Sequence, residues 1–188
     1  MSIRIYFDMD GVLADFELAV EHLSQGRTDL NNQGKLMTDE AKNAKKQRWQ
    51  RIEVTAGFFE NLHIVPKVQD LVSTAKDMGE IFVLTAVPSA KNFIAGESFV
   101  EHIKTAKRQW IADKMTDFFH PESVLIVTGA KENQIKPSKT DILIDDRAGN
   151  VADWIAAGGT GIHFKSAEQS IKDLTSFRLL YKIPIDIC

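Results

Sequence analysis

Five short apolar segments, separated by much longer stretches, constrain the fold of this chain more than any other feature. They occupy residues 3–7, 81–85, 124–128, 141–145 and 161–164. All but the last are continuously apolar rather than alternating, and they are rich in isoleucine and valine. Runs of this length and kind are typical of strands that are buried on both faces, as in a parallel sheet.

Segments with helical spacing lie between these expected strands. Apolar side chains recur on one helical stripe within residues 65–75, within residues 99–111, and at Val151, Trp154 and Ile155. An alternation of strand and helix indicates βαβ units. We therefore predict an α/β fold with a Rossmann-like parallel sheet and helices on both faces.

The alternation stops between the first and the second expected strand. This interval of about 45 residues is too long for a plain connection. It shows no clear strand, and its second half, MTDEAKNAKKQRWQRI, has the composition of a polar helix. We predict that residues 17–62 form a small helical cap over the end of the sheet, whereas residues 1–16 and 63–188 form the α/β core.

Polar residues stand where the expected strands end. Asp8 follows the first strand, Thr85 ends the second, Lys131 comes shortly after the third, and Asp145 and Asp146 close the fourth. The carboxyl ends of strands in an open parallel sheet lie along one edge, where ligands bind. We therefore expect these side chains to gather at one site although they are far apart in the sequence.

Three of the acids, Asp8, Asp10 and Asp145, would then crowd one place. Two carboxylates ~4 Å apart repel each other by roughly 1 kcal/mol in water, and by more in a cleft that excludes water. Such acids either raise their pKa values or hold a cation, and Mg²⁺ with its oxygen ligands is the simplest solution. Because Mg²⁺ readily shares a phosphate oxygen, the pattern indicates a magnesium site that performs phosphate chemistry.

The roles of these residues can be separated by their chemistry. Asp8, at the end of the strand, is placed to attack phosphorus and form an aspartyl-phosphate. Asp10, past the turn, could protonate the leaving oxygen and later activate water. A hydroxyl and an ammonium would hold the other phosphate oxygens. The candidate phosphate-binding residues are Thr85, Ala86, Lys131 and Gly11, the last of which also permits a tight turn after the acids.

The motifs also resemble a known family. The opening FDMDGVLADF at residues 7–16, VLTAVP at 83–88, the Lys–x–x–Trp spacing at 107–110, the Thr–x–x–Lys spacing at 128–131 and LIDDR at 143–147 occur in this order. Together they are similar to the motifs of the haloacid dehalogenase-like superfamily, and most similar to those of its 5′(3′)-deoxyribonucleotidase branch with its bacterial and phage relatives. The resemblance covers most of residues 3–164.

This resemblance implies a Mg²⁺-dependent phosphomonoesterase that acts through an aspartyl-phosphate. It makes Asp8 the nucleophile and Asp10 the general acid and base, with the backbone carbonyl of Asp10 on the metal. It makes Asp145 a further metal ligand that Asp146 supports. The expected partner is a small phosphorylated metabolite, such as a nucleoside monophosphate or deoxyribonucleotide, and the expected cofactor is Mg²⁺.

Several positions leave alternatives open. Lys136 rivals Lys131 as the phosphate-binding lysine, because the chain between Lys131 and the LIDDR motif is longer than in the characterised deoxyribonucleotidases. Phe16 matches an aromatic residue that touches the base in that branch, and Trp49 is a further candidate for substrate contact. Lys107 either reaches the phosphate or lies on the surface.

Other functions also stay open, namely hydrolysis of a sugar phosphate or of a nucleic-acid 3′-phosphate, or binding without catalysis. The net charge of −3 argues against binding long nucleic acid through its phosphates. No apolar run approaches the roughly 18 residues of a membrane span. The single cysteine, Cys188, excludes a disulfide within the chain and fits a cytoplasmic location.

Overall fold

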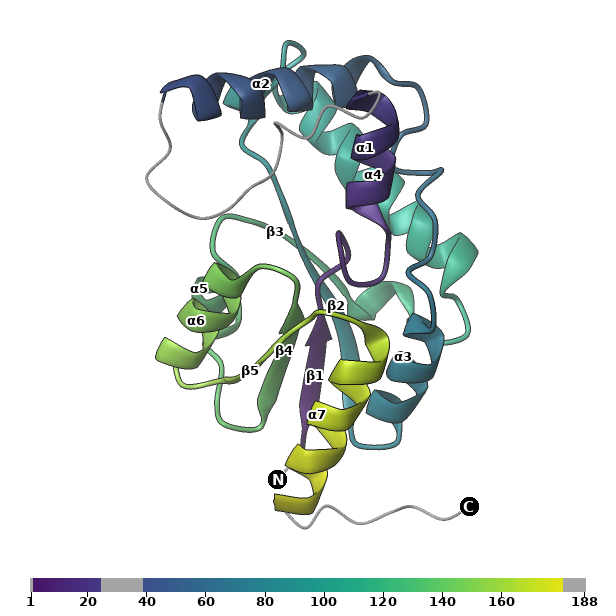
Figure 1. Ribbon diagram of the computed structural model, residues 1–188, viewed down its shortest axis with the longest axis vertical. Helices are drawn as coiled ribbons and strands as arrows, with labels where there is room; N and C mark the ends of the chain where they lie inside the picture. Colours follow the sequence, from purple (N-terminus) through teal and green to yellow (C-terminus); the bar gives the residue numbers. More distant parts are fainter. Residues whose placement is uncertain (1, 25–38, 181–188) are drawn as a thin grey trace.

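A computed structural model describes residues 2–24 and 39–180 of the chain. Its centre is a five-stranded parallel sheet with the strand order β3-β2-β1-β4-β5. The strands are β1 (Arg4–Phe7), β2 (Glu80–Val87), β3 (Val124–Thr128), β4 (Asp141–Asp145) and β5 (Thr160–His163). The predicted parallel sheet is thereby confirmed, and β1 is its central strand (Figure 1).

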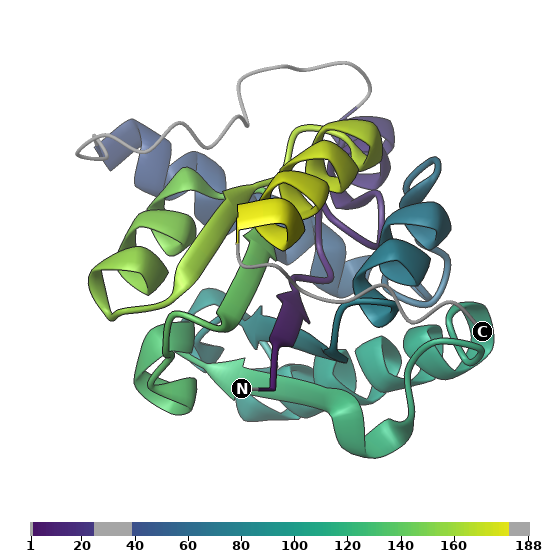
Figure 2. The same cartoon turned by 90° about the horizontal axis from the view of Figure 1, so that it is seen from below.

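Helices cover both faces of the sheet, as predicted (Figure 2). One face carries α3 (Val68–Lys76), α4 (Glu97–Lys114) and α7 (Ala167–Leu180), and the other carries α5 (Lys131–Ile135) and α6 (Ala148–Ala156). Crossovers between parallel strands are right-handed, so the helices change face where the strand order reverses after β3. Two single-turn 3₁₀ helices complete the core, η1 (Ala90–Asn92) and η2 (Pro121–Ser123).

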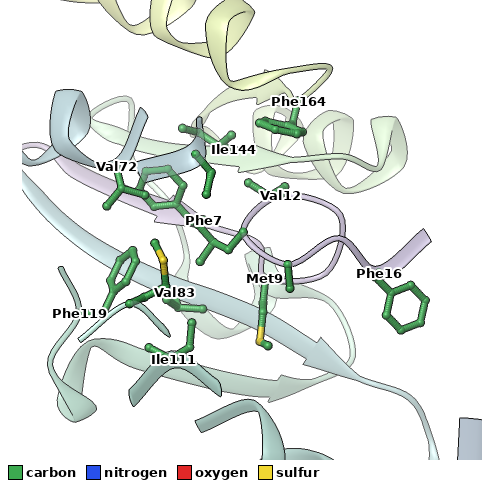
Figure 3. Close-up of a cluster of buried hydrophobic side chains, with 14 of the residues drawn as sticks. Phe7, Met9, Val12, Phe16, Val72, Val83, Ile111, Phe119, Ile144 and Phe164 are labelled. Atoms are coloured by element: carbon green, nitrogen blue, oxygen red, sulfur yellow. The ribbon is translucent and has the colours of Figure 1, made fainter. Parts of the chain in front are cut away.

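The larger part of the hydrophobic core lies between the sheet and the helices α3, α4 and α7 (Figure 3). Phe7 of β1 and Ile144 of β4 are completely buried there. The expected stripe of α6 is only partly correct, because Trp154 is buried whereas Ile155 is 52% exposed. The reason is that α6 covers the edge strand β5, where Ile155 lies against Gly161 and has no sheet beyond it.

Two of the described helices, α1 (Phe16–Ser24) and α2 (Asp39–Val54), follow β1 before α3 leads the chain back to the sheet. Figure 1 shows both beyond the carboxyl ends of the strands, where the predicted cap was expected. Residues 25–38 of that predicted cap, and Cys188, lie outside the described residues. The division of the chain at residues 17 and 62 therefore stays a prediction. Among the helices that the structure describes, none combines the length and apolar character needed to cross a membrane.

Candidate active site

The register of the sheet brings the acids of two distant motifs together. Phe7 of β1 pairs with Ile144 of β4, so the next residue of each strand, Asp8 and Asp145, emerges at the same level. The amide of Asp8 also donates to the carbonyl of Ile144 over 2.9 Å. Carboxylate oxygens of Asp8, Asp145 and Asp146 all lie within 4.8 Å of one another. The central position of β1 thus builds an acidic cluster from residues more than a hundred positions apart.

The turn after β1 depends on Gly11. This glycine has a φ of +81°, and a Cβ atom at its position would lie 2.4 Å from Oδ2 of Asp146. A side chain there would be strained and would displace that carboxylate. The turn is further closed by the Met9 amide, which donates to Oδ1 of Asp8 over 2.8 Å. Gly11 therefore lets the loop after β1 approach the acidic cluster.

Thr85 was expected to end the second strand, but β2 continues through Ala86 to Val87. The strand continues to Val87 because β3 pairs with it from Val83 to Val87. Thr85 is nevertheless buried close to the acidic residues, because β2 lies beside β1.

Lys131 is the buried cation of the cluster. Its Nζ lies 2.9 Å from Oδ1 of Asp8 and 2.7 Å from Oδ2 of Asp145. Burial alone would lower the pKa of Lys131, but these two carboxylates raise it above the ordinary value. Lys136, by contrast, is exposed at the end of α5. The fold thus brings Lys131 to the cluster and leaves Lys136 outside it.

Lys107 reaches the site from α4, and the alternative that it is a surface residue is wrong. Its side chain is only 1% exposed, and Nζ donates to Oδ2 of Asp10 over 2.7 Å and to Oγ1 of Thr85 over 2.8 Å. One turn later Nε1 of Trp110 donates to the carbonyl of Leu62 over 2.8 Å. This bond explains the Lys–x–x–Trp spacing, because it fixes the rotation of α4 that aims Lys107 at the site.

The carboxylate of Asp10 is held by Lys107. Its second oxygen, Oδ1, is buried without a hydrogen-bond partner. Burial raises the pKa of Asp10 above its ordinary value, Lys107 opposes this rise, and the neighbouring Asp8 adds to it. A raised pKa suits a group that has to donate a proton.

Asp145 has both of its carboxylate oxygens occupied by donors. Oδ2 accepts from Lys131, and Oδ1 accepts from the Arg147 amide over 2.9 Å. The side-chain amide of Asn150 lies within hydrogen-bond distance of both oxygens. Asn150 was not among the expected site residues. Its place five positions after Asp145, in the first turn of α6, is the signal that would have indicated it.

Asp146 was expected only to support the metal ligands, but it is the third member of the acidic cluster. Its Oδ1 is buried and has no hydrogen-bond partner. Burial first, and then the charges of Asp8 and Asp145, raise the pKa of Asp146 to about 7. Its carboxylate is therefore the least compensated of the cluster.

The residues fit a divalent metal ion by charge as well as by donor type. Four carboxylates face the two ammonium groups of Lys107 and Lys131, which leaves a charge of −2 when all groups are ionised. The unpaired Oδ1 of Asp146 is a hard donor of the kind that Mg²⁺ prefers.

Phe16 and Trp49 lie in an aromatic cluster beyond the acidic residues. The ring of Phe16 is 5.9 Å from that of Trp49 and 5.6 Å from that of Phe58. Phe16 is buried and Trp49 is half-buried, so both pack mainly against neighbouring rings. Phe59 packs against Phe16 and brings the aromatic cluster close to the ion pair of Lys107 and Asp10. Nζ of Lys107 lies 5.8 Å from the ring centre of Phe59.

Comparison with known proteins decides the family. Residues 1–175 match the family described as "5' nucleotidase, deoxy (Pyrimidine), cytosolic type C protein". The chain belongs to this family. Membership in this nucleotidase family confirms the predicted resemblance and makes the protein a phosphatase. A comparison with curated proteins found no match.

Solved structures show the same fold for this nucleotidase family member. A haloacid dehalogenase-like family hydrolase from Xanthomonas campestris is 11% identical, with 96% of this chain and 94% of that chain covered and a TM-score of 0.58. The HAD hydrolase YfnB from Bacillus subtilis, solved with bound magnesium, is 12% identical, with 92% and 98% covered and a TM-score of 0.53. The chain therefore has the haloacid dehalogenase-like α/β fold.

Proposed function

We propose that this nucleotidase family member is a Mg²⁺-dependent phosphomonoesterase for a nucleoside monophosphate, such as a deoxyribonucleotide. The observation that carries the proposal is the different pairing of two acids in one loop. Asp8 belongs to the acidic cluster and pairs with Lys131, whereas Asp10 pairs with Lys107. This difference supports the role of nucleophile for Asp8 and of proton donor for Asp10.

For the metal, we propose Asp8, the backbone carbonyl of Asp10, and Asp146 as the protein ligands. This revises the expectation that Asp145 is the direct ligand. Both oxygens of Asp145 already accept hydrogen bonds, whereas Oδ1 of Asp146 has none. When bound, Mg²⁺ would offset the negative charge of the carboxylates and of the substrate phosphate.

The covalent steps follow from the positions of the two aspartates. A carboxylate oxygen of Asp8 attacks phosphorus, the bond to the leaving oxygen breaks, and Asp10 gives its proton to that oxygen. Asp10 then takes a proton from water as the water oxygen attacks phosphorus, which releases phosphate and restores Asp8.

Two cationic or polar groups hold the phosphate during these steps. Lys131, beside Asp8, offsets the charge on the phosphate oxygens. The Thr85 hydroxyl accepts a hydrogen bond from Lys107, so its own hydrogen can be donated to a phosphate oxygen. Lys136, exposed at the end of α5, has no part in this assignment.

The proposed substrate class is supported by the family and by the leaving-group side of the site. The family description names deoxy and pyrimidine substrates and a cytosolic type, which also supports a cytoplasmic location. The aromatic cluster around Phe16 and Trp49 provides an apolar flank beside Asp10, which suits a nucleoside better than a bare sugar.

The test is phosphate release from a panel of ribonucleoside and deoxyribonucleoside monophosphates and sugar phosphates, with Mg²⁺ and with EDTA. We expect turnover of nucleoside monophosphates that EDTA abolishes. Asp8→Asn should lose turnover while it still binds the substrate in the presence of Mg²⁺. Full activity in EDTA, or turnover by Asp8→Asn, would contradict the mechanism, and faster release from sugar phosphates would contradict the substrate class.

A further inference from the structure

The side-chain amide of Asn150 donates hydrogen bonds to the carboxylate of Asp145. Its Nδ2 lies 2.9 Å from Oδ2 and 3.1 Å from Oδ1 of Asp145, so a single amide faces both oxygens. Asp145 has no exposed surface, and Asn150 is half-buried. A donor placed almost equally between two oxygens fixes the plane of the carboxylate as well as its position.

The orientation of Asp145 is passed on to Lys131. Oδ2 of Asp145 accepts from Nζ of Lys131 over 2.7 Å, and the same Nζ lies 2.9 Å from Oδ1 of Asp8. A lysine side chain has four rotatable bonds and a charge that imposes little direction. It keeps one position only when its partners are themselves fixed.

We propose that Asn150 is a positioning residue that acts through Asp145 to aim Lys131 at Asp8 and at the phosphate that binds there. This role presupposes the proposed function, because it requires a phosphate beside Asp8. An amide suits the position, since it donates without adding charge. A cation there would compete with Lys131 for Asp145, and a carboxylate would repel it.

A purely structural role for Asn150 is less consistent with the contacts of α6. The start of this helix is already joined to β4, because the Arg147 amide donates to Asp145 over 2.9 Å. Its later part is joined to the same strand by Nε1 of Trp154, which donates to the carbonyl of Asp141 over 3.0 Å. The amide of Asn150 is therefore not required to hold α6 on the sheet.

The test compares Asn150→Ala, which removes the donor, with Asn150→Asp, which keeps the shape but replaces the donor by an acceptor. The matched control is Asn61→Ala, which removes an amide that donates to the Gly57 carbonyl over 2.8 Å on the exposed surface. Calorimetry measures the affinity for inorganic phosphate in the presence of Mg²⁺, and thermal unfolding verifies the fold. We expect both Asn150 variants to bind phosphate about tenfold more weakly and the control to match the wild type.

A second measurement separates positioning from general damage. If Asn150 acts through Lys131, Asn150→Ala should weaken phosphate binding no further in a Lys131→Met background, whereas independent effects would add. Should Asn150→Ala not fold, Asn150→Ser, which keeps a hydroxyl donor, is expected to show a smaller loss of the same kind.

The outcomes distinguish this role from the proposed function. Folded Asn150 variants with wild-type phosphate affinity, or additive losses with Lys131→Met, would overturn the positioning role. A wild type that binds phosphate but releases none from any monophosphate would overturn the proposed function, and the binding data would still judge Asn150. A wild type that does not bind phosphate would overturn both.

Discussion

Two lysines of the site form ion pairs with different aspartates. Lys131 lies between Asp8 and Asp145, and Lys107 holds Asp10. Asp8 and Asp10 are two residues apart in one loop and carry the same functional group. Their different partners support the proposed roles of Asp8 as nucleophile and Asp10 as acid, because a carboxyl group takes its protonation state from its surroundings.

Replacing Lys107 by glutamine should therefore change the pH dependence of turnover. Loss of the Lys107 charge removes the contribution that opposes the raised pKa of Asp10, so this pKa rises further. We expect kcat to fall by about tenfold or more, because Asp10 loses its anchor. The alkaline limb of the pH–rate profile, where the acid loses its proton, should move to higher pH.

The matched control for this prediction is Lys104→Gln. Lys104 lies one turn earlier on α4 and pairs with Glu101 over 2.6 Å on the surface. It should keep the wild-type rate and profile. An alkaline limb that stays in place in Lys107→Gln would show that Lys107 does not set the pKa of Asp10.

At this scale the sequence predicted residue types better than contacts. The place of Asp8 beside Asp145 follows from strand ends and was predictable. The burial of Lys107 was not, because it depends on how α4 is rotated against the sheet. Nor were the different partners of Asp145 and Asp146, because they depend on which carboxylate meets Lys131 and Asn150.

Among the elements, α2 is joined by a carboxylate to the segment that precedes α4. The side chain of Glu53 accepts from the Ile94 amide over 2.8 Å and from the Ala95 amide over 2.6 Å. These amides belong to the segment that joins β2 to α4, the two elements that carry Thr85 and Lys107. Glu53 thereby ties a helix of the predicted cap to elements that hold the proposed phosphate site.

Glu53→Ala should loosen this connection. We expect the free energy of unfolding to fall by about 1 kcal/mol, because two backbone amides exchange a charged acceptor for water. KM for the best monophosphate should rise more than kcat falls, since α2 lies on the proposed leaving-group side. Denaturant unfolding and steady-state kinetics measure the two effects.

Glu101→Ala is the comparison for Glu53→Ala. It removes an exposed glutamate whose ion pair with Lys104 contributes roughly 0–0.5 kcal/mol. Equal stability and equal KM in the two variants would mean that the two amide bonds of Glu53 do not fasten α2.

The elements themselves were largely predictable, since continuous apolar runs can be placed only in a buried sheet. The limits of β2 were not, because its extension to Val87 depends on pairing with β3. The exposure of Ile155 on α6 was not predicted either. Edge and central strands have the same local sequence pattern, so the sequence does not show that α6 covers an edge strand.

For the whole molecule, the uncompensated carboxyl group of Asp146 should make the free energy of unfolding depend on pH. The pKa of Asp146 is about 7 in the folded chain, against an ordinary value of 3.8. Between these values the folded chain holds a proton that the unfolded chain has lost. Stability therefore falls as the pH rises from about 4 to about 7, and the raised pKa of Asp10 acts in the same direction.

We expect the metal-free protein to melt at a lower temperature at about pH 7.5 than at about pH 5, and Asp146→Asn to reduce this difference. Mg²⁺ should raise the melting temperature more at the higher pH, because at the lower pH it has to displace a proton. Differential scanning calorimetry measures both effects. The same pH dependence in wild type and Asp146→Asn would assign it to other groups.

The central place of β1 determines when the site can assemble during synthesis of the chain. β1 is made first, yet it is flanked by β2 and β4, and the latter ends at Asp145. During synthesis both neighbouring strands of Asp8 therefore exist only after β4 has left the ribosome. A nascent or prematurely terminated chain carries the opening motif but no catalytic centre.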